Sequence, residues 1–183
     1  PYQYPEKLLP VIIMNAVNGK SLPIYGDGKQ IRDWLYVDDH CKAIKLIIEN
    51  GKPGETYAVG GNNQPYNIEL VQSICAILDE LLPDSEFVPH EKLITFVADR
   101  PGHDRRYAIN HAKIKAELGW DPEVSLEDGL IKTVTWYLEN QDWVEKIKDD
   151  TAHKDWIKQN YGERKWKVLF SLAAMALAYI PWL

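Results

Sequence analysis

Short apolar runs of strand length alternate along this chain with longer stretches in which apolar residues recur every three or four positions. The first pattern suits a strand within a sheet, and the second buries one face of a helix. The alternation predicts an α/β fold. Helices are expected at Pro5–Val17, from Asp38 or Asp39 to Ile48, and at Ile68–Leu82, Asn110–Leu118, Leu126–Leu138, Trp143–Lys148 and Asp155–Asn160. Strands are expected at Leu22–Tyr25, Ile31–Val37, Thr56–Val59 and Ile94–Val97, the first two paired as a hairpin.

Charge and cysteine content narrow the class of protein. The 183 residues carry a formal net charge of -6, which argues against a protein that coats nucleic-acid phosphates, so no nucleic-acid partner is expected. Cys41 and Cys75 are the two cysteines, too few for a disulfide scaffold, and no metal-ligand spacing accompanies them. Cys75 falls within an expected helix and is interpreted as a buried structural residue. A cytoplasmic protein is predicted.

The two ends differ in composition from the middle. The chain starts without Met or a signal-peptide pattern, which predicts a piece of a longer protein. Residues 168–183 carry no charge, yet as a helix they would span about 24 Å, less than the ~30 Å hydrocarbon layer. Membrane contact, a packed terminal helix and an appended tail all stay open. We therefore divide the chain into a main portion, 1–164, and an atypical apolar tail, 165–183.

Arginine is concentrated in one short segment. The sequence has 5 Arg against 16 Lys, and three of the arginines fall within Asp99-Arg-Pro-Gly-His-Asp-Arg-Arg-Tyr107. Arg clamps phosphate oxygens through two parallel hydrogen bonds, and Pro101-Gly102 predicts a turn that would let side chains converge. The segment predicts an anion site. The alternative is a solvated loop whose arginines pair with Asp99 and Asp104.

A further arginine lies in the expected strand at Ile31–Val37. Alternation along that strand would place Arg32 on one face with Trp34 and Tyr36. Arg32 is a second candidate phosphate ligand, and an ion pair with a neighbouring aspartate is the competing interpretation.

Catalytic motifs are mostly missing from the sequence. There is no Gly-x-Gly-x-x-Gly loop, which predicts that NAD has no binding site in this chain. Tyr-x-x-x-Lys occurs at Tyr25 and at Tyr161, but glycines within both matches oppose the helix that would align the two side chains, so both are interpreted as coincidence.

Several longer runs resemble a known family. They are Pro1-Tyr-Gln-Tyr-Pro-Glu-Lys-Leu-Leu-Pro10, Leu22-Pro-Ile-Tyr-Gly-Asp-Gly28, Ile31-Arg-Asp-Trp-Leu-Tyr-Val-Asp-Asp-His40, Gly54-Glu-Thr-Tyr57 with Gly60-Gly61, and Ala98-Asp-Arg-Pro-Gly-His-Asp-Arg-Arg-Tyr-Ala108. Together they look like the dTDP-glucose 4,6-dehydratases, which are extended short-chain dehydrogenase/reductases. The match runs in order from Pro1 to about Arg164.

The resemblance implies the C-terminal substrate-binding portion of an extended Rossmann-type dehydratase, without the N-terminal half that carries the Gly-rich loop, the acid/base pair and the Tyr-x-x-x-Lys dyad. In that family NAD takes hydride from the fourth carbon of the sugar, water leaves across the fifth and sixth carbons, and hydride returns to the sixth. NAD would be bound by the missing half. The whole enzyme is expected to be a homodimer.

The resemblance also implies a substrate site. Arg32 and Arg100 should hold the diphosphate of dTDP-glucose or a related nucleotide sugar. The other residues implied in the pocket are Lys7, Leu8, Leu9, Pro23, Ile24, Tyr25, Asn67, Asp99, Pro101, Gly102, His103 and Tyr161.

Two hypotheses follow. In the first, the chain is the substrate half of an NAD-dependent lyase and is inactive by itself. In the second, it is a non-catalytic nucleotide-sugar-binding or membrane-associated interaction module. Under both, helices that lack the central parallel sheet should expose apolar surface.

Overall fold

The structure, a computed structural model, describes residues 7–149. The chain divides into two compact units, Pro1–Gln141 and Asp142–Leu183. Tyr161, the helix expected at Asp155–Asn160, the apolar tail and the predicted boundary at 164 lie outside the described residues. Within residues 7–149, no helix combines the length and the apolar character needed to cross a membrane.

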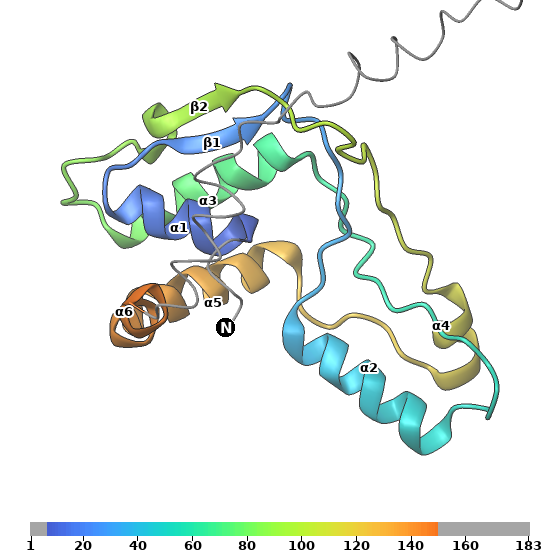
Figure 1. The fold of residues 1–183 in the computed structure, drawn as a ribbon. Coiled ribbons are helices and arrows are strands. Elements are labelled where there is room, and N and C mark those ends of the chain that lie inside the picture. Colours follow the sequence, from blue (N-terminus) through green and yellow to red (C-terminus); the bar gives the residue numbers. More distant parts are fainter. Residues whose placement is uncertain (1–6, 150–183) are drawn as a thin grey trace, which may run out of the picture. The chain divides into compact units, whose positions relative to one another are not determined.

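The first unit mixes helices with two short strands, as Figure 1 shows. Its elements in chain order are α1 (Leu8–Val17), β1 (Leu22–Tyr25), α2 (Val37–Asn50), α3 (Asn67–Leu81), the short 3₁₀ helix η1 (His90–Leu93), β2 (Ile94–Val97), α4 (Ala112–Leu118) and α5 (Leu126–Glu139). The helix α6 (Gln141–Asp149) starts at the boundary between the two units. The predicted α/β class is confirmed.

The two strands pair with each other and run parallel. Leu22 lies opposite Ile94, and Tyr25 lies opposite Val97. The hairpin expected from the sequence is therefore wrong. Gly26 donates its N–H to the Val97 carbonyl at 2.9 Å, so the chain after β1 stays beside β2 instead of folding back on β1.

Two other expected strands do not form. In the segment 31–37, Ile31 makes only isolated bridges, to Tyr66 and Arg106, and Val37 already begins α2. The segment Thr56–Val59 lies in extended chain without ladder partners among the described residues. A strand needs a continuous run of backbone hydrogen bonds to one neighbour, and the bonds made by the segment 31–37 are scattered over several partners.

The main core lies where α1, α3 and α5 pack on one another, with β1 against α1 (Figure 1). Its buried side chains are at helical spacing, which is why the sequence located these helices. They include Ile12, Ile13, Ala16, Leu22, Ile24, Leu70, Val71, Ile74, Cys75, Leu78, Leu130, Val134 and Tyr137. The expected burial of Cys75 is confirmed, and that burial raises the pKa of its thiol to about 12.

A smaller cluster joins α2 to α4. Ala43, Ile114 and Trp120 are buried at its centre. Asp39 fixes its edge, because one carboxylate oxygen accepts the backbone N–H groups of Glu123 at 3.0 Å and Val124 at 2.8 Å. The loop after α4 is thereby held to the first turn of α2.

Candidate functional site

Four of the five arginines lie within the described residues, and they differ in the hydrogen-bond partners of their guanidinium groups. Arg105 makes a bidentate pair with Asp27, at 2.7 and 3.0 Å. Arg106 donates to the side-chain oxygen of Gln64 at 2.7 Å. The Arg100 guanidinium has no hydrogen-bond or ion-pair partner within residues 7–149.

Arg32 forms no ion pair with the neighbouring aspartates. Its guanidinium carbon lies 4.6 Å from the centroid of the Tyr107 ring, and its Nη1 donates to the Ile31 carbonyl at 2.6 Å. Arg105 is thus the one described arginine with a carboxylate partner, and of the two arginines implied as diphosphate ligands, Arg32 bonds a backbone carbonyl while Arg100 has no partner in the described part of the chain.

Asp99 organises the turn that carries Arg100. One of its oxygens accepts the backbone N–H of Arg100 at 2.9 Å and lies 2.7 Å from Nδ1 of His103. Its other oxygen accepts from the side-chain amide of Gln30, which is 1% exposed, at 3.0 Å. The bond to His103 is the main reason that the pKa of Asp99 falls below its usual value. The ionised carboxylate therefore fixes the turn at neutral pH.

The turn contacts β1 directly and is linked to α3 through Gln30. His103 packs edge-on to Tyr25 at the end of β1, with ring centroids 6.2 Å apart. Asn67, the first residue of α3, donates its backbone N–H to the Gln30 carbonyl at 2.9 Å. Its side-chain oxygen is buried without a hydrogen-bond partner in the described residues. An acceptor left in this state suits a donor from a bound ligand.

The structure places the remaining implied residues less uniformly. Lys7 precedes α1, Leu8 and Leu9 lie in its first turn, and Pro23 is half-buried on β1. Ile24 is 2% exposed, and its side chain lies in the core. Pro101 and Gly102 are exposed at the tip of the turn.

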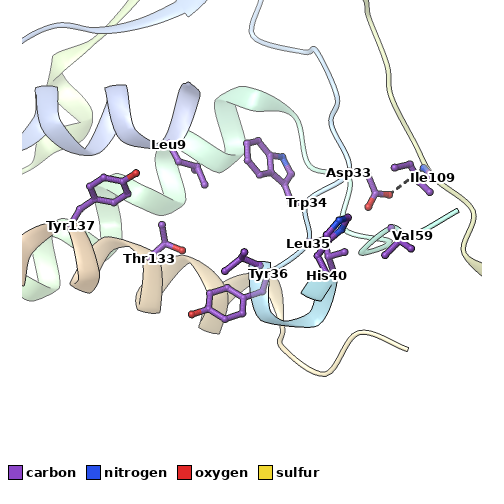
Figure 2. Close-up of a pocket in the computed structure, with 12 residues that line it drawn as sticks. Leu9, Asp33, Trp34, Leu35, Tyr36, His40, Val59, Ile109, Thr133 and Tyr137 are labelled. Atoms are coloured by element: carbon purple, nitrogen blue, oxygen red, sulfur yellow. Dashed lines mark hydrogen bonds between the residues drawn. The ribbon is translucent and has the colours of Figure 1, made fainter. Parts of the chain in front are cut away.

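A hollow of about 450 Å³, whose lining residues Figure 2 draws, has none of the described arginines in its lining. Sequence reasoning missed this hollow, although its lining includes Trp34 and Tyr36, the two aromatic residues that alternation groups with Arg32. Among the implied site residues that the structure describes, Leu9 alone is in its lining. A second hollow, of about 520 Å³, includes Arg106 and Lys115. Arg32 and Arg100 line neither of the two. The lining residues of the first are Leu9, Asp33, Trp34, Leu35, Tyr36, Val37, His40, Val59, Gly60, Ile109, Thr133 and Tyr137.

Asp33 holds the wall of the 450 Å³ hollow together. Its carboxylate accepts the backbone N–H of Gly61 at 2.5 Å and the side-chain amide of Gln64 at 3.0 Å. A longer contact, 3.4 Å, reaches the backbone N–H of Ile109 and is drawn in Figure 2. A side chain at Gly61 would place its Cβ 1.9 Å from the Trp34 carbonyl oxygen, so only glycine fits there.

The described residues do not fit NAD. A dinucleotide cradle needs a strand, a Gly-rich turn and the N-terminus of a helix in succession. Here β1 leads through Gly26-Asp27-Gly28 into extended chain, and β2 leads into the Asp99 turn. Among residues 7–149, no group of three or more metal-ligating side chains gathers either.

Comparison with known proteins supplies the family. Residues 1–133 match the family described as GDP-mannose 4,6 dehydratase. The dTDP-glucose 4,6-dehydratase of Escherichia coli is 54% identical over 165 residues, which are 90% of this chain and 45% of that protein. The chain therefore spans about half the length of the curated relatives that it matches.

Solved structures agree with this match. A dTDP-glucose 4,6-dehydratase from Bacillus anthracis, in complex with NAD, is 47% identical with a TM-score of 0.69, covering 80% of this chain and 44% of that one. The Streptomyces venezuelae enzyme of the same name, with NAD and TYD bound, is 44% identical with a TM-score of 0.70, covering 80% and 43%. The resemblance noted in the sequence is confirmed, and this chain belongs to the GDP-mannose 4,6 dehydratase family.

Proposed function

We propose that this chain forms the nucleotide-sugar-binding portion of a dTDP-glucose 4,6-dehydratase, in which Arg32 and Arg100 hold the diphosphate. The observation that carries the proposal is the unequal engagement of the clustered arginines. Arg105 is paired with a carboxylate and Arg106 with an amide oxygen, whereas Arg32 bonds one backbone carbonyl and stacks on a ring, and Arg100 has no partner in the described part of the chain. Guanidinium groups with open donor edges suit bidentate recognition of phosphate oxygens.

The surroundings of the two arginines support a nucleotide sugar as the ligand. The buried Asn67 oxygen lacks a partner among the described residues and offers an acceptor. His103 and Tyr25 contribute rings for a base or sugar, and Asp99 holds His103 in place. The wall also includes Lys7, and Tyr161 is assigned to it by resemblance alone. The S. venezuelae relative is bound to NAD and TYD, which agrees with this choice of ligand.

The reaction proposed for the whole enzyme converts dTDP-glucose to dTDP-4-keto-6-deoxyglucose and water. That conversion needs NAD as hydride acceptor and donor, and the described residues lack a cradle for it. This chain would therefore bind and orient the nucleotide sugar, and it would be inactive by itself. A cytoplasmic location and a homodimeric whole enzyme are further parts of the proposal.

An apolar stripe on α2 agrees with a chain that works joined to another half. Val37, Cys41, Ile44 and Ile48 recur at spacings of four, three and four, which places them on one helix face. Val37, Ile44 and Ile48 are 43%, 44% and 79% exposed. This is the exposed apolar surface expected for helices without their central sheet. The part of the relatives that this chain does not span is the proposed cover.

The second hypothesis, a non-catalytic nucleotide-sugar-binding module, is favoured by one observation. It is the lack of a dinucleotide cradle in residues 7–149, which suits a protein that binds without reacting. Both hypotheses share the same arginines, so binding is tested first and turnover second.

The binding test is calorimetry of the full chain with dTDP. Arg32→Ala and Arg100→Ala should each weaken binding at least about tenfold, because a hydrogen bond to a charged group contributes about 1.5–3 kcal/mol. Arg106→Ala is the matched control, since it removes the same charge from the second hollow, and it should stay within about twofold of the unchanged chain. Equal affinities for all four proteins would refute the proposal that Arg32 and Arg100 hold the diphosphate.

The turnover test supplies dTDP-glucose and NAD and follows the 4-keto product. The chain by itself should give none. Addition of the part of the E. coli relative that this chain does not cover should restore product under the enzyme hypothesis and leave it absent under the module hypothesis. Turnover by this chain without that addition would contradict both.

A further inference from the structure

The Arg32 guanidinium stacks on the ring of Tyr107, which follows the Asp99 turn that carries Arg100. Its guanidinium carbon lies 4.6 Å from the centroid of Tyr107. The Nη1 donor is turned back to the Ile31 carbonyl at 2.6 Å. A guanidinium stacked on a ring face has fewer conformations available while its in-plane N–H donors stay accessible at the edge.

The ring itself is fixed from two sides. Tyr107 donates its backbone N–H to the Ile31 carbonyl at 3.0 Å, and Ile31 donates to the Arg105 carbonyl at 2.8 Å. These bonds align the segment after the Asp99 turn with the segment that carries Arg32. The Tyr107 hydroxyl hydrogen-bonds to the carboxylate of Asp104. Tyr107 is 53% exposed, yet hydrogen bonds fix it at its backbone N–H and at its hydroxyl.

Asp104 and the two arginines act in opposite directions on the Tyr107 hydroxyl. The hydrogen bond to Asp104 raises the pKa of Tyr107, and the positive charges of Arg32 and Arg100 both oppose that rise. The direct contact of the ring is with Arg32.

We propose that Tyr107 is a positioning residue, whose ring holds the Arg32 guanidinium in the conformation that binds the diphosphate of a nucleotide sugar. The inference rests on the proposed function. It assigns the effect to the ring face and not to the hydroxyl, because the hydroxyl is engaged by Asp104 on the chain's own turn.

The test measures the affinity of the full chain for dTDP by calorimetry. Tyr107→Leu removes the ring and should weaken binding about three- to tenfold, while Tyr107→Phe keeps the ring and should stay within about twofold. In an Arg32→Ala background the Tyr107→Leu change should have no further effect, because the group that it positions is gone. Thermal unfolding checks that each variant is folded.

Tyr57 provides a matched control. The Lys113 Nζ lies 4.8 Å from the centroid of the Tyr57 ring, and this equivalent cation and ring pair lies at the α2 and α4 cluster. Tyr57→Leu should leave dTDP affinity within about twofold, provided that thermal unfolding shows a folded chain.

The outcomes separate this inference from the function on which it rests. If the unchanged chain binds no dTDP, the proposed function fails. If it binds dTDP and Tyr107→Leu binds equally well, the positioning role is wrong. A loss in Tyr107→Phe as large as in Tyr107→Leu would assign the effect to the hydroxyl and overturn the inference. Equal losses from Tyr107→Leu with and without Arg32 would show a structural effect only.

Discussion

Asp39 offers a test of how the α2 and α4 cluster is held. It is 0% exposed, and one of its oxygens accepts two backbone N–H groups, from Glu123 at 3.0 Å and Val124 at 2.8 Å. Each hydrogen bond to a charged group contributes about 1.5–3 kcal/mol, and water can replace part of this at the half-exposed loop. Asp39→Ala should therefore lower the free energy of unfolding by about 3 kcal/mol.

Two further variants make the test specific. Asp39→Asn keeps one carbonyl oxygen for the two N–H groups, and the expected loss is about 1 kcal/mol. Asp38→Ala removes a carboxylate from the same first turn of α2, but Asp38 is exposed, so only the helix-dipole effect of about 0.5 kcal/mol is lost.

Urea unfolding followed by circular dichroism measures all four proteins. With slopes of about 1–3 kcal/mol per molar urea, the midpoint of Asp39→Ala should fall by roughly 1–3 M relative to the unchanged chain. A midpoint for Asp39→Ala equal to that of Asp38→Ala would refute the argument that the buried acceptor holds the loop.

Three more predictions follow from exposure and charge. The hydrogen bond with Arg105 lowers the pKa of Asp27 from 3.8 to about 2, so the stability that Asp27 adds is present above pH 3.8 and is lost as pH falls through about 2. The difference in melting temperature between the unchanged chain and Asp27→Asn should therefore shrink over that range. A difference that stays constant would contradict this prediction. At pH 8 the exposed Cys41 should react with a thiol reagent while Cys75, buried with a pKa of about 12, reacts only after unfolding; two fast thiols in the native chain would be the opposite result. Ile48→Glu should reduce binding of an apolar dye with melting temperature unchanged, because this side chain is 79% exposed, and an equal dye signal would show that the α2 stripe is not the exposed surface.

Local pattern was sufficient for most helices. The apolar spacing in α1, α3 and α5 located each of them within a few residues, because a helix buries one face and closes its own backbone hydrogen bonds. Helix starts were less accurate. The helix expected from Ile68 begins one residue earlier, at Asn67, and Glu69 accepts the backbone N–H of Tyr66 at its start.

Strands were predicted less well for a physical reason. A strand needs a partner strand, and the local sequence does not show which distant segment will provide it. β1 and β2 form because each pairs with the other, although 68 residues separate the end of β1 at Tyr25 from the start of β2 at Ile94. The segments at 31–37 and 56–59 have similar composition and stay outside any ladder in the described part of the chain.

The sequence by itself determined the α/β class, the arginine-rich turn and the family resemblance, because composition, periodicity and a specific motif are properties of the chain read in order. Only the tertiary structure decided which arginines are engaged: Asp27 and Gln64 occupy Arg105 and Arg106, and Tyr107 carries Arg32. The engagement of each guanidinium depends on residues up to 78 positions away, which meet it only when the chain has folded.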